Sequence, residues 1–214
     1  MSKKFNNINT IILTGGKSSR MGYDKSQLQF GETTLLEKTI SLVSPHFADI
    51  ILSVREKEAY PQLKLKKAVD ICRGFGPIVG IYSSLLVSDT ENNFIVSCDL
   101  PFINEELVLF IVDYPSDQQI KIPVFNNKVH PMCGVYTTNI LPLLEKLLNQ
   151  HISNNQIDNG KNKSLSMKNF FKIVSVEYID IEKKFPGYNP ELLFNINTMD
   201  DYYKAKRIIK NSQL

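Results

Sequence analysis

The chain has 214 residues, of which 43% are hydrophobic, so it can form a sizeable core, and global disorder is excluded. Its 25 basic and 22 acidic side chains leave a net charge of +3, which does not indicate a dedicated nucleic-acid-binding surface. The three cysteines form no C-x-x-C pair, and no apolar run approaches the length of a membrane span. We therefore expect a protein of the reducing cytoplasm, with no membrane or nucleic-acid partner.

The first half of the chain alternates short apolar runs with helical patterns. We predict strands over residues 10–13, 49–54, 68–71 and 94–97. We predict helices over residues 34–43, 56–63 and 77–86, and a further helix that Asn104 caps and that ends at residue 112. This alternation predicts an α/β fold with a doubly wound, mostly parallel, Rossmann-like sheet and helices on both faces.

The second half is less regular. We predict strands over residues 120–125 and 129–136 on either side of the turn Asn126-Asn127, and a helix over 138–148. Residues 149–163 are the most polar stretch, and we predict that they form a flexible insertion in a single domain spanning residues 1–214. Further strands are predicted over 172–179 and 192–196, followed by a helix over 199–209 that Thr198 caps.

Chemically interesting residues follow three of the predicted strands. Gly15 and Gly16 come after the first strand, Asp70 ends the third, and Asp99 comes just after the fourth. In open α/β sheets, ligands bind beyond the carboxyl ends of the strands, near the point where the strand order reverses. These residues are therefore predicted to converge on one site.

The loop after the first strand is typical of a phosphate site. Gly15 and Gly16 allow the backbone to approach a phosphate, and Arg20 and Lys25 supply positive charge. A P-loop is disfavoured because the position that needs its first glycine is Ile11, and the adjacent glycines do not fit the dinucleotide fingerprint. An ordinary glycine turn with solvated charges remains the alternative.

The acidic residues have two interpretations each. Asp99 could bind Mg²⁺, which needs only one or two protein carboxylates beside phosphate oxygens, or it could cap the loop before the next helix. Asp70 could contact a nucleotide or lie in a surface turn. Asp24 could do no more than orient its neighbour Lys25.

Several motifs occur in a fixed order along the chain. They are G-G-x-x-x-R-M-G-x-D-K at residues 15–25, Asp70 followed by G-P-I-V-G-I at 76–81, C-D-L-P-F at 98–102, His130-Pro131 with Tyr136, and N-I-N-T at 195–198. The set spans about residues 8–210 and resembles the molybdenum cofactor guanylyltransferases, the MobA family. Two positions depart from it: Thr14 replaces the usual alanine, and Ser53 stands where many relatives carry asparagine.

The resemblance implies a fold like that of the nucleotide-diphospho-sugar transferases and transfer of GMP from GTP to Mo-molybdopterin, with Mg²⁺ as the metal. It also points to molybdoenzyme apoproteins or their chaperones as partners. The implied site comprises Arg20, Lys25 and Asp99 as catalytic residues, Asp99 also as the metal ligand, and Leu13, Thr14, Gly15, Gly16, Lys25, Ser53, Asp70, Asp99, Asn195 and Asn197 as binding residues, the two asparagines on the pterin side. A cytidylyltransferase on the same scaffold and a non-catalytic cofactor carrier remain alternatives.

Overall fold

The structure, a computed structural model, describes residues 3–15, 24–72, 75–153 and 165–212. Its strands are β1 (Ile8–Leu13), β2 (Gln29–Phe30), β3 (Thr33–Thr34), β4 (Ile50–Val54), β5 (Lys66–Val69), β6 (Asn92–Ser97), β7 (Ile120–Phe125), β8 (Lys128–Val129), β9 (Cys133–Thr137) and β10 (Val176–Asp180). Its helices are η1 (Lys25–Gln27), α1 (Leu35–Val43), α2 (Pro77–Val87), α3 (Glu105–Asp113), η2 (Thr138–Ile140), α4 (Leu141–Ser153), α5 (Met167–Phe170), α6 (Ile181–Lys184) and α7 (Met199–Ser212).

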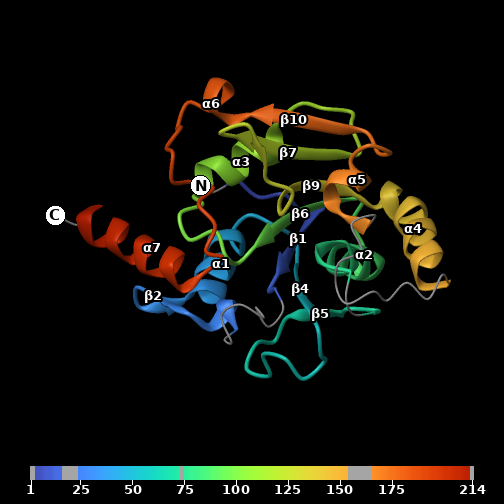
Figure 1. Cartoon of the computed structure of the whole chain (residues 1–214), viewed down its shortest axis with the longest axis horizontal. Coiled ribbons are helices and arrows are strands. Elements are labelled where there is room, and N and C mark those ends of the chain that lie inside the picture. Colours follow the sequence, from blue (N-terminus) through green and yellow to red (C-terminus); the bar gives the residue numbers. More distant parts are fainter. Residues whose placement is uncertain (1–2, 16–23, 73–74, 154–164, 213–214) are drawn as a thin grey trace.

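The described residues form one eight-stranded sheet in the order β10-β7-β9-β6-β1-β4-β5, with β8 paired to β7 (Figure 1). Strands β5, β4, β1 and β6 are parallel, β9 runs antiparallel to both β6 and β7, and β10 is parallel to β7. The chain reaches β4 and β5 on one side of β1 and then crosses to β6 on the other. The predicted doubly wound, mostly parallel α/β sheet is therefore confirmed.

Helices cover both faces of the sheet, as predicted (Figure 1). On one face α1 and α3 pack against β1, β4 and β6 through side chains such as Leu36 and Leu107. On the other face α2 and α4 pack through side chains such as Ile81 and Leu144. The central strands are buried on both faces, which explains why their sequences are continuous apolar runs rather than alternations of apolar and polar residues.

Two helix starts follow the sequence closely. Thr34 caps α1 by accepting from the N–H of Glu37 at 3.2 Å, and the Glu37 carboxylate accepts from the N–H of Thr34 at 2.8 Å. Asn104 caps α3 by accepting from the N–H of Leu107 at 3.0 Å. Each cap satisfies backbone groups that have no partner inside the helix, and so fixes where the chain leaves the sheet edge.

Several sequence predictions are wrong in detail. Residues 56–63 form turns rather than a helix. The strand predicted over 129–136 is split into β8 and β9, because the chain turns at His130 and Pro131 lacks the N–H that a sheet needs. The strand predicted over 172–179 begins only at Val176. A short 3-10 turn, η2, precedes α4.

Two larger corrections concern the second half. The segment 192–196, predicted as a strand, forms a turn followed by irregular backbone outside the sheet, and the N–H of Ile196 donates to the carbonyl of Asp99 at 3.0 Å. The predicted flexible insertion does not begin at Asn149, because α4 continues to Ser153. Residues 154–163 lie outside the described residues, so flexibility there stays a prediction.

The final helix, α7, lies apart from the two main layers (Figure 1). It packs through Tyr202 and Ala205 against Phe30 and Leu35, at the hairpin of β2 and β3 and the start of α1. The Tyr202 hydroxyl donates to the carbonyl of Gln29 at 2.6 Å. Within the described part of the chain, no helix has the length and hydropathy needed to cross a membrane.

Candidate functional site

The carboxyl ends of three neighbouring strands lie level with one another. In the sheet register, Leu13 at the end of β1 is opposite Ser53 of β4 on one side and Ser97 of β6 on the other. The chain leaves β1 through Thr14 and leaves β6 through Cys98, so the residues that follow both strands open at the same edge. Gly15, Asp70 and Asp99 thus lie at the same edge of the sheet, and their convergence on one binding site stays a prediction.

The start of the glycine loop is anchored to both neighbouring strands. Thr14 is buried, and its hydroxyl donates to the carbonyl of Ser53 at 2.8 Å. The N–H of Cys98 donates to the carbonyl of Leu13 at 3.3 Å. Gly15 follows with φ of +75°, a left-handed conformation that favours glycine. Gly16 and Arg20 lie outside the described residues, so their predicted phosphate contacts stay predictions.

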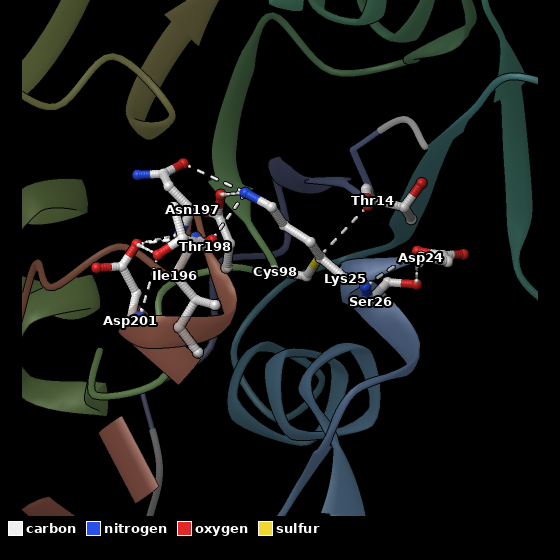
Figure 2. Close-up of polar contacts among 10 residues, drawn as sticks. Thr14, Asp24, Lys25, Ser26, Cys98, Ile196, Asn197, Thr198 and Asp201 are labelled. Atoms are coloured by element: carbon white, nitrogen blue, oxygen red, sulfur yellow. Dashed lines mark hydrogen bonds and ion pairs between the residues drawn. The ribbon is translucent and has the colours of Figure 1, made fainter. Parts of the chain in front are cut away.

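Lys25 crosses the site from η1. Figure 2 shows its side chain extending toward Ile196 and Asn197, where the ammonium donates to the carbonyl of Ile196 at 2.8 Å and to Oδ1 of Asn197 at 3.2 Å. The same nitrogen lies 3.9 Å from Oδ2 of Asp99, and the side chains of Lys25 and Asp99 are 16% and 15% exposed. Lys25 therefore joins the β6 edge to the segment before α7.

Asp99 is the most enclosed acid of this edge. In the amide orientation that pairs donors with acceptors, the side-chain nitrogen of Asn195 donates to its Oδ1 at 2.7 Å and its Oδ2 at 3.2 Å. Burial raises the pKa of Asp99, while Ser97 and Lys25 oppose that rise. A carboxylate held in this way is costly to ionise, and a cation beside it would reduce that cost.

The backbone carrying Asn195 and Asn197 is fixed from both sides. The N–H of Ile196 donates to the carbonyl of Asp99 at 3.0 Å. Thr198 and Asp201 then form a reciprocal cap on α7, in which Asp201 accepts from the N–H groups of Asn197 and Thr198, and Thr198 accepts from the N–H of Asp201. The predicted cap at Thr198 is confirmed, and the spacing of a threonine three residues before an acid could have predicted the role of Asp201.

A second group of predicted residues meets across β4 and β5. Ser53 is buried in β4, and Asp70 directly follows β5. Gly80 of α2 faces both: a Cβ there would lie 2.7 Å from the Ser53 hydroxyl and 3.6 Å from Oδ1 of Asp70. Burial raises the pKa of Asp70, partly offset by Arg55. Oδ1 of Asp70 is buried and has no hydrogen-bond partner among the described residues.

Sequence reasoning missed the residue that holds the loop end beside Lys25. The Tyr60 hydroxyl donates to Oδ2 of Asp24 at 2.9 Å and lies 2.8 Å from the hydroxyl of Ser26. Asp24 in turn caps η1 by accepting from the N–H of Ser26 at 3.0 Å. No periodicity or motif in the sequence identifies Tyr60, which sits in the stretch predicted to be helical.

A cavity of about 580 Å³ is lined by Asn195, the residue whose side chain contacts Asp99. Ser97, Asn197, Lys128 and Lys204 contribute further polar groups to its lining. Its apolar wall is formed by Leu100, Phe125, Val129, Pro131, Met132, Cys133, Pro190, Leu193 and Phe194. A cavity that combines an apolar wall with several convergent polar groups can hold a small molecule.

The donors at this edge suit a hard divalent cation. Among the described residues, no three His, Cys, Asp or Glu side chains converge into a complete protein metal site. Asp99 offers a largely buried carboxylate just after β6, which matches the one or two protein ligands that Mg²⁺ takes beside phosphate oxygens. Asp99 fits a metal of this kind when the remaining ligands come from substrate.

Comparison with known proteins gives one family match and many similar chains. The family model described as "MobA-like NTP transferase domain" matches residues 10–162. The chain is 32% identical over 203 residues to a probable molybdenum cofactor guanylyltransferase of Carboxydothermus hydrogenoformans, covering 94% of this chain and 96% of the relative. It is also 32% identical to a protein of the same name from Clostridium perfringens, covering 89% and 92%.

Solved structures agree on the fold. The crystal structure of molybdopterin-guanine dinucleotide biosynthesis protein A from Archaeoglobus fulgidus superposes with a TM-score of 0.76, covering 95% of this chain and 99% of that one. The two sequences are 22% identical, so this likeness speaks to the fold alone. It confirms the predicted nucleotidyltransferase-type α/β architecture.

Proposed function

This chain belongs to the MobA-like NTP transferase family, and from that premise we propose that it is a molybdenum cofactor guanylyltransferase. The enzyme transfers GMP from GTP to Mo-molybdopterin, giving Mo-molybdopterin guanine dinucleotide and pyrophosphate. A phosphate oxygen of the acceptor forms a bond to the α-phosphorus of GTP, and the bond from that phosphorus to the oxygen bridging to the β-phosphorus breaks. The acceptor phosphate is already ionised near neutral pH, so a protein base is not required.

The observation that carries the proposal is the position of Asp99 and Lys25. Asp99 follows β6, the neighbour of the strand that leads to Gly15, and it contacts Asn195; Lys25 contacts Asn197, and both asparagines line the cavity. Charge develops on phosphate oxygens between the two substrates, and a fixed cation and a metal-binding carboxylate at that junction stabilise it. Lys25 binds to the acceptor-side segment through Ile196, so its charge is held at the junction itself.

The nucleotide side is assigned to the loop from Leu13 to Gly16, with Ser53 and Asp70. Backbone N–H groups of Gly15 and Gly16 would face the phosphates, with Arg20 as a second cation. The unpartnered oxygen of Asp70 would accept from the nucleoside, whose hydroxyl and N–H groups are donors.

The metal assigned here is Mg²⁺ at Asp99. When bound, it supplies positive charge to the phosphate oxygens of the reacting groups. The contribution of this chain is to place the Lys25 ammonium beside Asp99, where it opposes the rise in the pKa of the carboxyl that burial causes, and to orient that carboxylate through Asn195. The same two neighbours hold the carboxylate at the sheet edge, so it does not need to move when substrates arrive.

The acceptor is assigned to the cavity beside Asn195 and Asn197. Side-chain amides both donate and accept hydrogen bonds, as a pterin ring requires. His130 also lines this cavity, and burial lowers its pKa, which makes the imidazole a weaker base, so we assign it a structural role. Molybdoenzyme apoproteins or their chaperones are the proposed recipients of the product. The free cysteines, with Cys98 and Cys133 buried, are compatible with the proposed cytoplasmic location.

The direct test compares nucleotides. Purified protein with Mo-molybdopterin and MgCl₂ is given GTP, CTP, ATP or UTP, and pyrophosphate release is measured with thermal shifts in parallel. We expect release from GTP and the largest shift with GTP. Release from CTP instead would assign the cytidylyltransferase alternative, and acceptor binding without release from any nucleotide would assign a cofactor carrier.

A further inference from the structure

Tyr60 has an unusual backbone for its residue type. It lies in the turns after β4 with φ of +52°, and the other non-glycine residues of the described chain with positive φ are Asn126 and Asn127. Asparagine tolerates the left-handed region, whereas a bulky aromatic residue rarely adopts it. Tyr60 is therefore held there by its surroundings, and its ring packs partly buried against the core on the α1 face of the sheet.

Its hydroxyl completes a small network around the end of the glycine loop. It donates to Oδ2 of Asp24 at 2.9 Å and lies 2.8 Å from Oγ of Ser26. The other oxygen of Asp24, Oδ1, accepts from the N–H and the hydroxyl of Ser26 at 3.0 and 2.8 Å. Burial raises the pKa of Tyr60 to about 12, so the hydroxyl keeps its proton at neutral pH. Both carboxylate oxygens of Asp24 are thus engaged.

This network fixes the position of the Lys25 backbone. Asp24 directly precedes Lys25 and caps η1, the single turn that carries it. The Lys25 ammonium reaches the carbonyl of Ile196, so both ends of this side chain are fixed: one through Asp24, the other through the segment before α7. A short turn such as η1 has little stability of its own, so its position depends on these contacts.

We propose that Tyr60 is a positioning residue for Lys25, acting through Asp24 to hold the ammonium at the junction of the two substrates. The inference rests on the proposed function, because Lys25 has its role at the reacting phosphates. Among the described residues, Tyr60 does not line the cavity, and its hydrogen bonds to Asp24 and Ser26 connect it to the turn that carries Lys25.

The test is a double-mutant cycle with Tyr60→Phe, Lys25→Ala and the double variant. Tyr60→Phe keeps the ring that packs on the core and removes only the hydroxyl. We expect kcat/KM for pyrophosphate release to fall about tenfold, mostly in kcat, because a small displacement of a catalytic group slows turnover more than it weakens binding. In the absence of the Lys25 side chain, the same change should cost less than about twofold.

Two further variants serve as a negative control and as a second perturbation of the same network. Tyr203→Phe removes the hydroxyl of a tyrosine on α7 that is 55% exposed, and it should leave kcat/KM and the melting temperature unchanged. Ser26→Ala removes the hydroxyl beside Tyr60 and Asp24, and should give part of the Tyr60→Phe loss, again only when Lys25 is present. A purely structural role of Tyr60 would lower the melting temperature and reduce activity by the same factor with or without Lys25, and that result would overturn the proposal.

A second readout separates this inference from the proposed function. Inorganic pyrophosphate, titrated by calorimetry, probes the phosphate site without a base or an acceptor. Tyr60→Phe should weaken its affinity severalfold, and should add no further loss to Lys25→Ala. A wild-type protein that binds pyrophosphate but releases none from any nucleotide contradicts the proposed function, while the coupling in pyrophosphate affinity still decides the role of Tyr60. Independent, multiplicative losses in that affinity would reject it.

Discussion

Asp70 and Asp99 lie at the same edge of the sheet, but their carboxylates differ in the hydrogen-bond and ion-pair partners that the protein gives them. Burial raises the pKa of both carboxyls. Asp99 has Asn195 and Lys25 as neighbours, whereas Oδ1 of Asp70 has no hydrogen-bond partner among the described residues. The Asp99 region is assembled before any ligand arrives, and the Asp70 region leaves an acceptor for a ligand to satisfy. The residues around Asp99, where we place the reaction, are thus already held in position. Asp70, where we place nucleotide recognition, instead keeps a hydrogen-bond acceptor free for a ligand.

The largest expected effect comes from Asp99→Asn. The change keeps the shape of the side chain but removes the charge that a divalent ion needs, so pyrophosphate release should fall by about 10³-fold, corresponding to several kcal/mol of barrier. Release is measured against MgCl₂ concentration for both proteins. Overlapping metal titrations at similar melting temperatures would show that Asp99 is not the metal ligand.

The same variant should not be less stable. Because the pKa of Asp99 is raised on folding, the folded state favours the protonated form, and ionisation costs stability as the pH rises above the usual value of 3.8. Without metal, Asp99→Asn should therefore melt at or above the wild-type temperature at pH 7.5, and this advantage should shrink as the pH falls toward 3.8. A large loss of stability at pH 7.5 would assign Asp99 a structural role instead.

Lys25→Ala should have the next largest effect. Loss of one preorganised charge at the reacting phosphates costs about 3 kcal/mol of barrier, or roughly a hundredfold in kcat/KM. Lys25 also lowers the pKa of Asp99, so its removal should move the acid limb of the pH–rate profile to higher pH. The control is Lys210→Ala, on the exposed end of α7. An unchanged rate in a folded Lys25→Ala protein would contradict the role.

Asp70→Asn should separate binding from chemistry. If Asp70 accepts from the nucleoside, losing its charge should raise KM for GTP about tenfold with a smaller change in kcat, as expected for one hydrogen bond to a charged group. Its raised pKa means that ionised Asp70 destabilises the fold above its usual value of 3.8, so the variant should melt higher at neutral pH. A fall in kcat at unchanged KM would place Asp70 with Asp99 instead.

The smallest effect is expected from Lys204→Gln. Lys204 lines the cavity, and its ammonium lies 5.3 Å from the ring centroid of Phe194. An exposed charge of this kind contributes about 0.5–1 kcal/mol, so KM for the acceptor should rise only a few-fold while KM for GTP stays constant. Steady-state kinetics with either substrate varied provides the measurement. A change in KM for GTP would place the cavity on the nucleotide side.

The parallel half of the sheet could be predicted because its signals are local. A buried apolar run followed by glycine or aspartate, as at Gly15 and Asp99, marks both a strand end and the residue that opens from it. The apolar spacing predicted a helix from residue 34, one residue before α1 begins, and the predicted cap at Asn104 marks the start of α3. Each of these features depends on neighbours within a few residues, which the sequence displays directly.

The rest depends on contacts that sequence spacing does not show. The segment 192–196 is mostly apolar and is therefore predicted as a strand. Its apolar side chains instead pack into the core outside the sheet, and the N–H of Ile196 donates to the carbonyl of Asp99 rather than to a strand. The hydroxyl of Tyr60 pairs with Asp24, which lies 36 residues earlier in the sequence. Asn195 and Asn197 were identified through motif resemblance, since nothing in their local pattern distinguishes a ligand contact from a turn.

The contact between Lys25 and Ile196 spans 171 residues, and that between Tyr202 and Gln29 spans 173. During synthesis, Lys25 and Asp99 leave the ribosome long before Ile196, so a growing chain carries the charged pair without the carbonyl and the amide that hold it. Joining such distant segments is slow, because the entropy cost of closing a long loop must be met before the contact adds any stability. Until residues 195–198 have folded against Asp99, Lys25 therefore lacks the carbonyl of Ile196 and the side-chain oxygen of Asn197 that hold its ammonium in the site where we place catalysis.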